Sequence, residues 1–157
     1  MALEFNRSKA NMAITWYQVS IEAGKIMVFI DIWRSFRALP GWVQIWVAFI
    51  LAPVNLVSLA FLSEPGGWLV ALLAIGGMLP NMPILFGERG FSKLMALPHV
   101  LIWTPLLFVI WNLLSTSASG SFALFLWALL IVDAISLGFD FPDLWKCWKG
   151  DRVVARP

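Results

Sequence analysis

Four long apolar segments, separated by short polar or glycine-rich stretches, dominate the chain after residue 40. A segment of about 20 apolar residues is long enough to cross the hydrocarbon core of a bilayer as an α-helix. The pattern predicts an all-α integral membrane protein in which residues 41–140 form one transmembrane bundle. Its four antiparallel transmembrane helices are expected at Gly41–Ser63, Trp68–Gly87, Leu94–Leu114 and Phe122–Asp140.

The segment before these spans has a different pattern, because its apolar residues recur every three or four positions. Residues 12–38 are expected to form an amphipathic helix with the apolar stripe Trp16, Val19, Ala23, Ile26, Ile30 and Trp33. A fifth span here would bury Glu22, Lys25 and Asp31, which is costly. We therefore expect an interfacial helix on the membrane surface, within a cytoplasmic N-terminal segment at residues 1–40 that ends at Pro40.

Residues 141–157 read as a cytoplasmic tail next to the membrane. Trp145, Lys146, Trp148 and Lys149 follow closely after Pro142. Tryptophan is enriched at the headgroup level, where lysine also reaches water. This pattern predicts a short C-terminal interfacial helix.

Lysine and arginine residues fall on one side of the predicted topology. All eleven lie before the first span, between the second and third, or after the fourth, and the other two connections contain none. The translocon retains these residues at the cytoplasmic side, so both termini are predicted to be cytoplasmic, in an inner or plasma membrane. The basic excess also favours anionic lipids at the cytoplasmic face.

Composition excludes several other classes of protein. Hydrophobic residues make up 61% of the chain and charged residues 13%, against about 45–50% and about 25% in a soluble domain. No basic run with interleaved aromatic residues is present, so no nucleic-acid partner is expected. One cysteine, Cys147, excludes an internal disulfide, and one histidine argues against a zinc site held by protein ligands alone. No metal site is predicted.

Three polar residues inside the predicted spans are the main candidates for chemistry. Counted from the predicted span ends, Asn81, His99 and Asp133 all lie roughly 8–10 Å inside the cytoplasmic boundary. An ionised side chain at that depth costs at least about 2.5–3.5 kcal/mol unless it is paired or hydrated. We therefore expect Asp133 to face the bundle interior and to contact His99.

This intramembrane polar layer has two interpretations. It could relay protons or cations, because histidine titrates near neutral pH. It could equally be a set of buried hydrogen bonds that holds the spans together. Ser136 and Asp140 share a helix face with Asp133. They form either a polar track to the cytoplasm or, for Asp140, a cap for the C-terminal helix.

Several prolines interrupt the predicted spans, and each interior proline removes one backbone hydrogen bond. The candidate helix breaks are Pro53, Pro80, Pro83, Pro98 and Pro105. Pro80 and Pro83 form the densest break, one turn after Gly76 and Gly77. Broken helices line the binding sites of transporters, although they also occur as simple kinks.

The sequence favours a small membrane subunit or scaffold that packs with other membrane proteins or with itself as a homo-oligomer. Four short spans without sizeable loops leave little room for an independent transport path. The alternative is a small transporter or channel with the layer of Asn81, His99 and Asp133 at its centre. A second alternative is a membrane-embedded enzyme, or a subunit that holds a cofactor such as haem on His99. No cofactor is expected, and the sequence identifies no catalytic residue.

Overall fold

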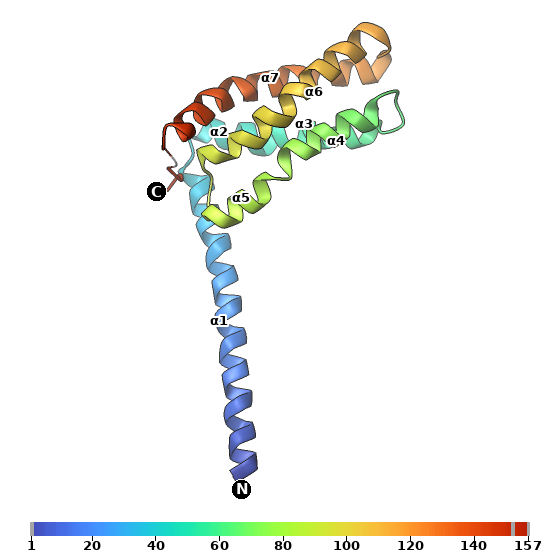
Figure 1. Ribbon diagram of the computed structural model, residues 1–157. Helices are drawn as coiled ribbons and strands as arrows, with labels where there is room; N and C mark the ends of the chain where they lie inside the picture. The colour runs from blue at the N-terminus through green and yellow to red at the C-terminus, as the bar shows by residue number, and fades with distance from the viewer. Residues whose placement is uncertain (1, 152, 157) are drawn as a thin grey trace.

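The computed structural model describes residues 2–151 and 153–156, with side chains from residue 14 onward, and it is almost entirely helical. Four helical runs are long and apolar enough to cross a membrane: Gly41–Phe61, Gly67–Glu88, Lys93–Thr116 and Gly120–Trp148. They lie beside one another in a bundle (Figure 1). The prediction of an all-α protein with four candidate membrane spans is therefore confirmed.

The first span changes helical type along its length without being interrupted. The N–H of Ala52 donates to the carbonyl of Val47, five residues earlier, which widens the turn before Pro53. Pro53 itself sits in the first turn of the next α-helical segment, where a missing N–H costs little. The segments are α2 (Gly41–Ile45), the π-helix η1 (Trp46–Leu51), α3 (Ala52–Val57) and the 3₁₀-helix η2 (Ser58–Phe61).

The second span is broken where the sequence has its densest proline cluster. Helix α4 (Gly67–Met78) ends before Pro80, and α5 (Asn81–Glu88) continues in a different direction (Figure 1). The N–H of Met82 donates to the carbonyl of Leu79 at 3.0 Å, so the break leaves that carbonyl paired. Asn81 thereby becomes the first residue of a new helix.

The third span joins a short 3₁₀-helix, η3 (Lys93–Met95), to helix α6 (Ala96–Thr116). Pro98 lies in the first turn of α6 and Pro105 in its interior, and the helix continues through both. Only some of the candidate breaks therefore interrupt a helix.

The fourth span is longer than predicted, because α7 runs from Gly120 to Trp148 without interruption. The expected end at Asp140 is wrong, and the expected C-terminal helix is the last part of α7 rather than a separate element. The sequence pattern placed the boundary at a charged residue followed by Pro142. Asp140 has a protein partner inside the bundle, described below, and a single interior proline removes only one hydrogen bond.

The N-terminal helix α1 (Ala2–Ala38) projects away from the bundle (Figure 1). Among its described side chains, those of the last turns attach it to the bundle. The N–H of Phe91 donates to Ser35 Oγ at 2.8 Å, and the rings of Phe29 and Phe86 meet edge to face at 5.7 Å. Asp31 also lies 3.8 Å from the Arg89 guanidinium. From Ile14 to Gly24 most side chains of α1 are exposed.

The expected division of this helix into an apolar and a polar face is not present. Besides the predicted stripe, apolar side chains occupy the opposite side of α1 at Ile14, Ile21, Val28 and Ile32. Polar side chains such as Glu22 and Lys25 lie between these two apolar sides, and a single flat surface covers only one of them.

The core of the bundle lies where α4, α6 and α7 meet. Its fully buried side chains include Trp103, Leu106, Ile110, Phe122, Leu126 and Leu129. Gly77 on α4 leaves room for the indole of Trp103, since a Cβ added there would lie only 2.2 Å from Trp103 Nε1. A close helix–helix approach of this kind depends on a small residue.

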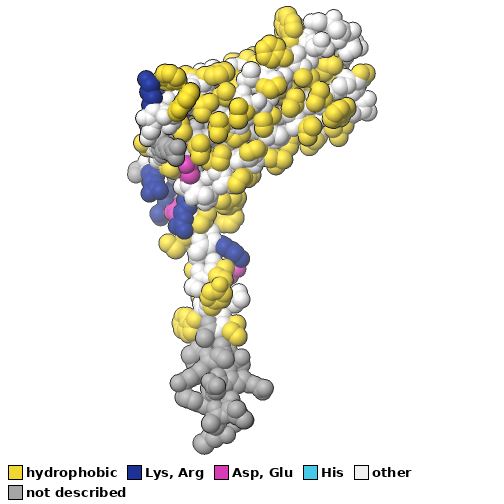
Figure 2. Space-filling view, viewed as in Figure 1, with side chains coloured by type: hydrophobic (Ala, Val, Ile, Leu, Met, Phe, Trp, Pro, Cys, Tyr) yellow, Lys and Arg dark blue, Asp and Glu magenta, His cyan; other side chains and the backbone are white. Residues whose placement is uncertain are grey.

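Charged side chains gather at one end of the bundle, where α1 joins it, and the rest of the visible bundle surface is apolar or uncharged (Figure 2). The C-terminal tail is fastened at the same end. Lys93 pairs with Asp151, Ser92 and Val154 form an antiparallel bridge, and the N–H of Ala155 donates to Phe91 O at 2.8 Å. We call this the charged end.

Candidate functional site

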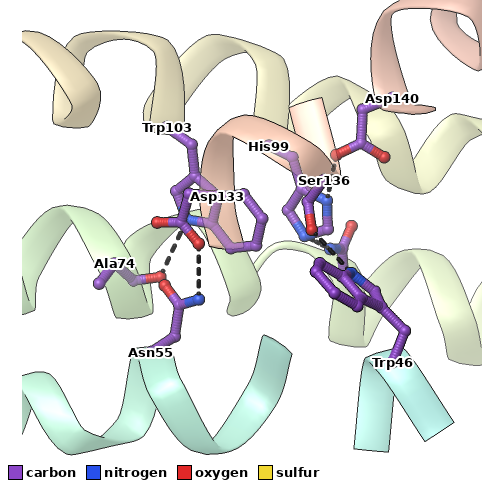
Figure 3. A network of polar contacts seen from close by, with 9 residues as sticks. Trp46, Asn55, Ala74, His99, Trp103, Asp133, Ser136 and Asp140 are labelled. Carbon is purple, nitrogen blue, oxygen red and sulfur yellow. Dashed lines mark hydrogen bonds and ion pairs between the residues drawn. The ribbon is translucent and has the colours of Figure 1, made fainter. Parts of the chain in front are cut away.

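Buried polar side chains lie at two depths in the bundle, and Figure 3 shows both groups. The deep pair consists of Asn55 on α3 and Asp133 on α7. The histidine group consists of His99 on α6, Asn81 on α5 and Asp140 on α7. The first joins the first and fourth spans, and the second joins the second, third and fourth.

The deep pair is held by one interhelical hydrogen bond. Asn55 Nδ2 donates to Asp133 Oδ1 at 2.9 Å, and also to the carbonyl of Leu51 on its own span at 3.1 Å. Both side chains are 0% exposed. Asn55 Oδ1 and Asp133 Oδ2 are buried without a hydrogen-bond partner. The pair therefore has two acceptor atoms for which no donor is supplied.

The histidine group uses both nitrogens of the only imidazole in the chain. His99 Nε2 lies 2.7 Å from Asn81 Nδ2, and His99 Nδ1 lies 3.0 Å from Asp140 Oδ2. Asn81 reaches the imidazole because the helix break at Pro80 starts α5 at this point. The break thus positions a polar residue rather than leaving a gap in the helix.

This arrangement accommodates either protonation state of His99. With Asn81 Nδ2 donating to Nε2, the imidazole is neutral, and its Nδ1–H donates to Asp140. Rotating the Asn81 amide by half a turn would present Oδ1 to an Nε2–H, and an imidazolium would then lie between an amide oxygen and a carboxylate. The histidine group is therefore chemically able to gain or lose one proton without losing either contact.

Trp103 fixes the plane of the imidazole. Its ring is stacked on His99 with centroids 4.0 Å apart and an interplanar angle of 3°. The indole N–H donates to Ala74 O at 3.1 Å, which ties the tryptophan to α4. A rigid aromatic surface on one side and two hydrogen bonds at its edges leave the imidazole little freedom to turn.

A third polar contact lies beside these groups, between Trp46 Nε1, the donor, and Ser136 Oγ at 3.0 Å. The polar face of α7 therefore bonds a different segment at each position: Asp133 bonds α3, Ser136 bonds η1 and Asp140 bonds α6. Among the described residues these three share no direct hydrogen bond with one another. The predicted polar track is thus a row of attachment points between α7 and its neighbours.

The predicted contact between Asp133 and His99 is wrong, although Asp133 faces the bundle interior as expected. The cause is the end of the fourth span. Measured from Trp148, Asp133 is 15 residues deep, whereas Asp140 is 8 residues deep. His99 is only 6 residues from Lys93, the start of its span. Asp133 therefore lies below the level of His99, and Asp140 lies at it.

Three residues of the site are not assigned to it from the sequence. The sequence predicts Asn55 only as an interhelical hydrogen-bonding residue and Trp103 only as a packing residue, and it does not single out Trp46. Asn55 lies 14 residues after Gly41, which matches the depth of Asp133 once the true end of α7 is known. The signal was present in the sequence but depended on that boundary. The two tryptophans carried no separate signal, since tryptophan is common at membrane interfaces and in cores.

Ligands for a metal ion are scarce in this arrangement. Within the described part of the chain, no three His, Cys, Asp or Glu side chains are grouped so that they could hold one. An axial bond from His99 to a haem would have to replace one of its two hydrogen bonds.

Comparison with known proteins adds no assignment. No known protein family, curated protein sequence or solved structure is significantly similar to this chain. The candidate site is therefore interpreted from its own geometry.

Proposed function

We propose that this protein is a small membrane scaffold subunit that assembles through α1 with a second copy of itself. The observation that carries the proposal is the uncovered apolar surface of α1. Trp16, Val19 and Ile26 are exposed along one side, and Ile14 and Tyr17 along the other. A single flat surface, such as a bilayer, covers only one side of a helix.

The position of α1 supports this proposal. A helix of 37 residues is about 55 Å long, and α1 runs across the direction of the spans from the charged end (Figure 1). If the spans cross a membrane, α1 lies along its surface, beyond the edge of its own bundle. The side of α1 that contacts its own bundle through Asp31 and Ser35 also carries Tyr17, and this side would meet lipid. The stripe that contains Val19 lies on the opposite side and is free for a protein.

A second copy of the chain fits the side that carries the Val19 stripe. Among the described side chains of α1, the hydrogen bond, ring contact and ion pair with the bundle come from its last turns, which leaves residues 14–28 for another protein. Within this stretch Glu22 and Lys25 form an ion pair at 2.7 Å, so two such arms would not repel each other by net charge. Contact of this stripe with a second copy, together with lipid on the other side, would cover both apolar sides of the helix.

The buried polar contacts support a structural subunit more than a transporter. Each polar residue on the inner face of α7 is bonded to a different segment, which is the arrangement expected of residues that hold helices together. A transport path through Asp133 and His99 would need a connection that the direct hydrogen bonds do not supply.

The orientation follows from the basic residues. We infer that the charged end is cytoplasmic, so that both termini lie in the cytoplasm of a cell with this protein in its inner or plasma membrane. Anionic lipids at that leaflet would pair with the basic residues. Reporter fusions at Gly90 and Ser117 should give cytoplasmic and external signals respectively, and the reverse result would overturn this orientation.

The assembly is tested by photocrosslinking in lipid nanodiscs and in membranes. A photoreactive residue at Val19 should give an adduct of two copies of the chain, because this side of α1 meets the partner. The matched control is Tyr17, on the opposite side and similarly exposed, where adducts with lipid should dominate. A monomeric protein with lipid adducts at both positions would overturn the proposal.

A further inference from the structure

The deep pair has an unusual balance of donors and acceptors. The Asn55 amide uses its two hydrogens on Leu51 O and Asp133 Oδ1. The remaining oxygens, Asn55 Oδ1 and Asp133 Oδ2, have no donor, and both side chains are fully buried. Buried acceptors without partners are rare, because each loses the hydrogen bonds that it would make with water.

Among the described residues, no positive charge faces this carboxyl group. The first span, Gly41–Phe61, and α4 contain no charged residue, and His99 is the only ionisable residue of α6. His99 is already bonded to Asp140, the nearest other carboxylate on α7. An ionised Asp133 would therefore be an unpaired charge inside the bundle, which proteins avoid.

The two oxygens without donors belong to side chains that face each other, as Figure 3 shows. An amide and a carboxyl group that meet edge to edge can form two parallel hydrogen bonds. One bond is present, from Asn55 Nδ2 to Asp133 Oδ1. A hydrogen on Asp133 Oδ2 would complete the second bond, to Asn55 Oδ1, and would satisfy both acceptors at once.

We propose that the deep pair is a proton-binding site, in which Asp133 carries a proton on Oδ2 and donates it to Asn55 Oδ1. The carboxylate takes one proton from a hydronium ion of the solvent: an O–H bond of that ion breaks as the Oδ2–H bond forms, and a water molecule is left. Release of the proton to water reverses this step. The neutral pair then joins α3 to α7 by two hydrogen bonds in place of one. Binding of a proton thus fastens the first span to the fourth, independently of the assembly through α1.

Infrared spectroscopy of the full chain in nanodiscs tests this proposal. With isotope-labelled aspartate, the wild-type protein at neutral pH should show the carbonyl band of a protonated carboxyl group, shifted by the label. Asp133→Asn should abolish this band. The matched control is Asp140→Asn, on the same helix, which should retain it. Absence of the band from the wild type, or its survival in Asp133→Asn, would overturn the proposal.

Two further measurements keep the test decisive. Asp133→Asn should unfold at the same temperature as the wild type, because an amide N–H can take the place of the carboxyl O–H. If that variant does not fold, Asn55→Ala serves instead, and its carboxyl band should shift because the second hydrogen bond is lost. Exchange of sodium for choline should change neither the infrared carboxyl band nor the unfolding temperature. If sodium stabilises the protein and the carboxyl band is absent, the deep pair binds a cation instead, and the proposal of a bound proton is refuted.

Discussion

The deep pair and the histidine group each connect an amide to a carboxyl group, at two depths of one bundle. The connection is direct in the deep pair and passes through the imidazole of His99 in the histidine group. Asn81, His99 and Asp140 lie near the charged end, and the side chains of His99 and Asp140 remain 13% and 19% exposed. Asn55 and Asp133 are 0% exposed and share one direct bond. The difference indicates that polar contacts near the charged end are partly open to solvent. Contacts at the centre must be satisfied from within, which makes the deep pair more sensitive to the loss of a partner.

The largest effect is expected from Trp103, which supports the histidine group from the core. Trp103→Ala should lower the free energy of unfolding by about 3–5 kcal/mol, because it removes a fully buried ring and leaves a cavity. The matched control is Trp111→Ala on the same helix, whose side chain is 59% exposed and should matter far less. Unfolding in mixed micelles measures both, and equal losses would contradict the assignment of Trp103 to the core.

The second-largest decrease in the free energy of unfolding is expected from replacement of Asn55. Asn55→Leu removes the only described donor to Asp133, so we expect a loss of about 1–2 kcal/mol in the same assay. The double variant Asn55→Leu/Asp133→Leu should recover most of this loss, since neither polar group then remains buried alone. Additive losses in the double variant would argue that the two side chains do not interact.

A smaller decrease in the free energy of unfolding is expected from a change in the histidine group. His99→Phe keeps a ring to stack on Trp103 but loses both hydrogen bonds. Because Asp140 lies near the charged end and can be hydrated, the free energy of unfolding should fall by only about 0.5–1 kcal/mol. A loss greater than that of Asn55→Leu would reverse the comparison between the two depths.

The smallest effect is expected outside the bundle, at the exposed pair of Lys93 and Asp151. The hydrogen bond from Lys93 is the main cause that holds the pKa of Asp151 below its usual value of about 3.9. Since the pKa is lower in the folded protein, this pair stabilises the fold above that value. Its contribution fades as pH falls and is gone once the folded form is protonated.

Protection of the Ala155 amide from hydrogen exchange reports on this contact, because the Ala155 N–H of the C-terminal tail donates to Phe91 O. Protection of Ala155 should decrease below about pH 4 in the wild type. Asp151→Asn should show reduced protection that no longer depends on pH in this range. An unchanged pH dependence in that variant would assign the effect to another group.

The number and class of the spans could be predicted from the sequence, because span length is set by bilayer thickness and is visible as apolar length. The start of the first span at Gly41 agrees, and the ends of the second and third agree within two residues. The fourth span did not agree. Its charged residue and its proline resemble a boundary, and only the partner of Asp140 explains why the helix continues.

The pairing within the site could not be predicted. Residue spacing gives the depth of a side chain in a helix but not the direction in which that helix faces its neighbours. His99 and Asp133 seemed level only because the end of α7 was misplaced. Their true partners depend on how each helix is rotated, and packing of residues such as Trp103 against Gly77 determines that rotation.

The N-terminal helix shows the opposite error, in which a correct pattern was incomplete. The stripe from Trp16 to Trp33 is real, and the helix is present. The residues outside this stripe include Glu22, Lys25 and Asp31, but also the apolar Ile21, Val28 and Ile32 on the opposite side. For this reason the expected division into faces failed, and a helix apolar on two sides became the main observation behind the proposed assembly.

The π-helix η1 determines how the second half of the first span is rotated relative to the first half. A turn with one residue more than an α-helix shifts every later side chain by the angle between consecutive residues, about 100°. Trp46 lies at the start of this turn and Asn55 lies beyond it. The direction in which each side chain faces α7 can therefore be set independently of the other. Insertion or deletion of a single residue in Trp46–Leu51 would thus turn Asn55 to another direction while Trp46 keeps its position. Such a change could alter the polar contacts at the centre of the bundle and leave those near the charged end unchanged.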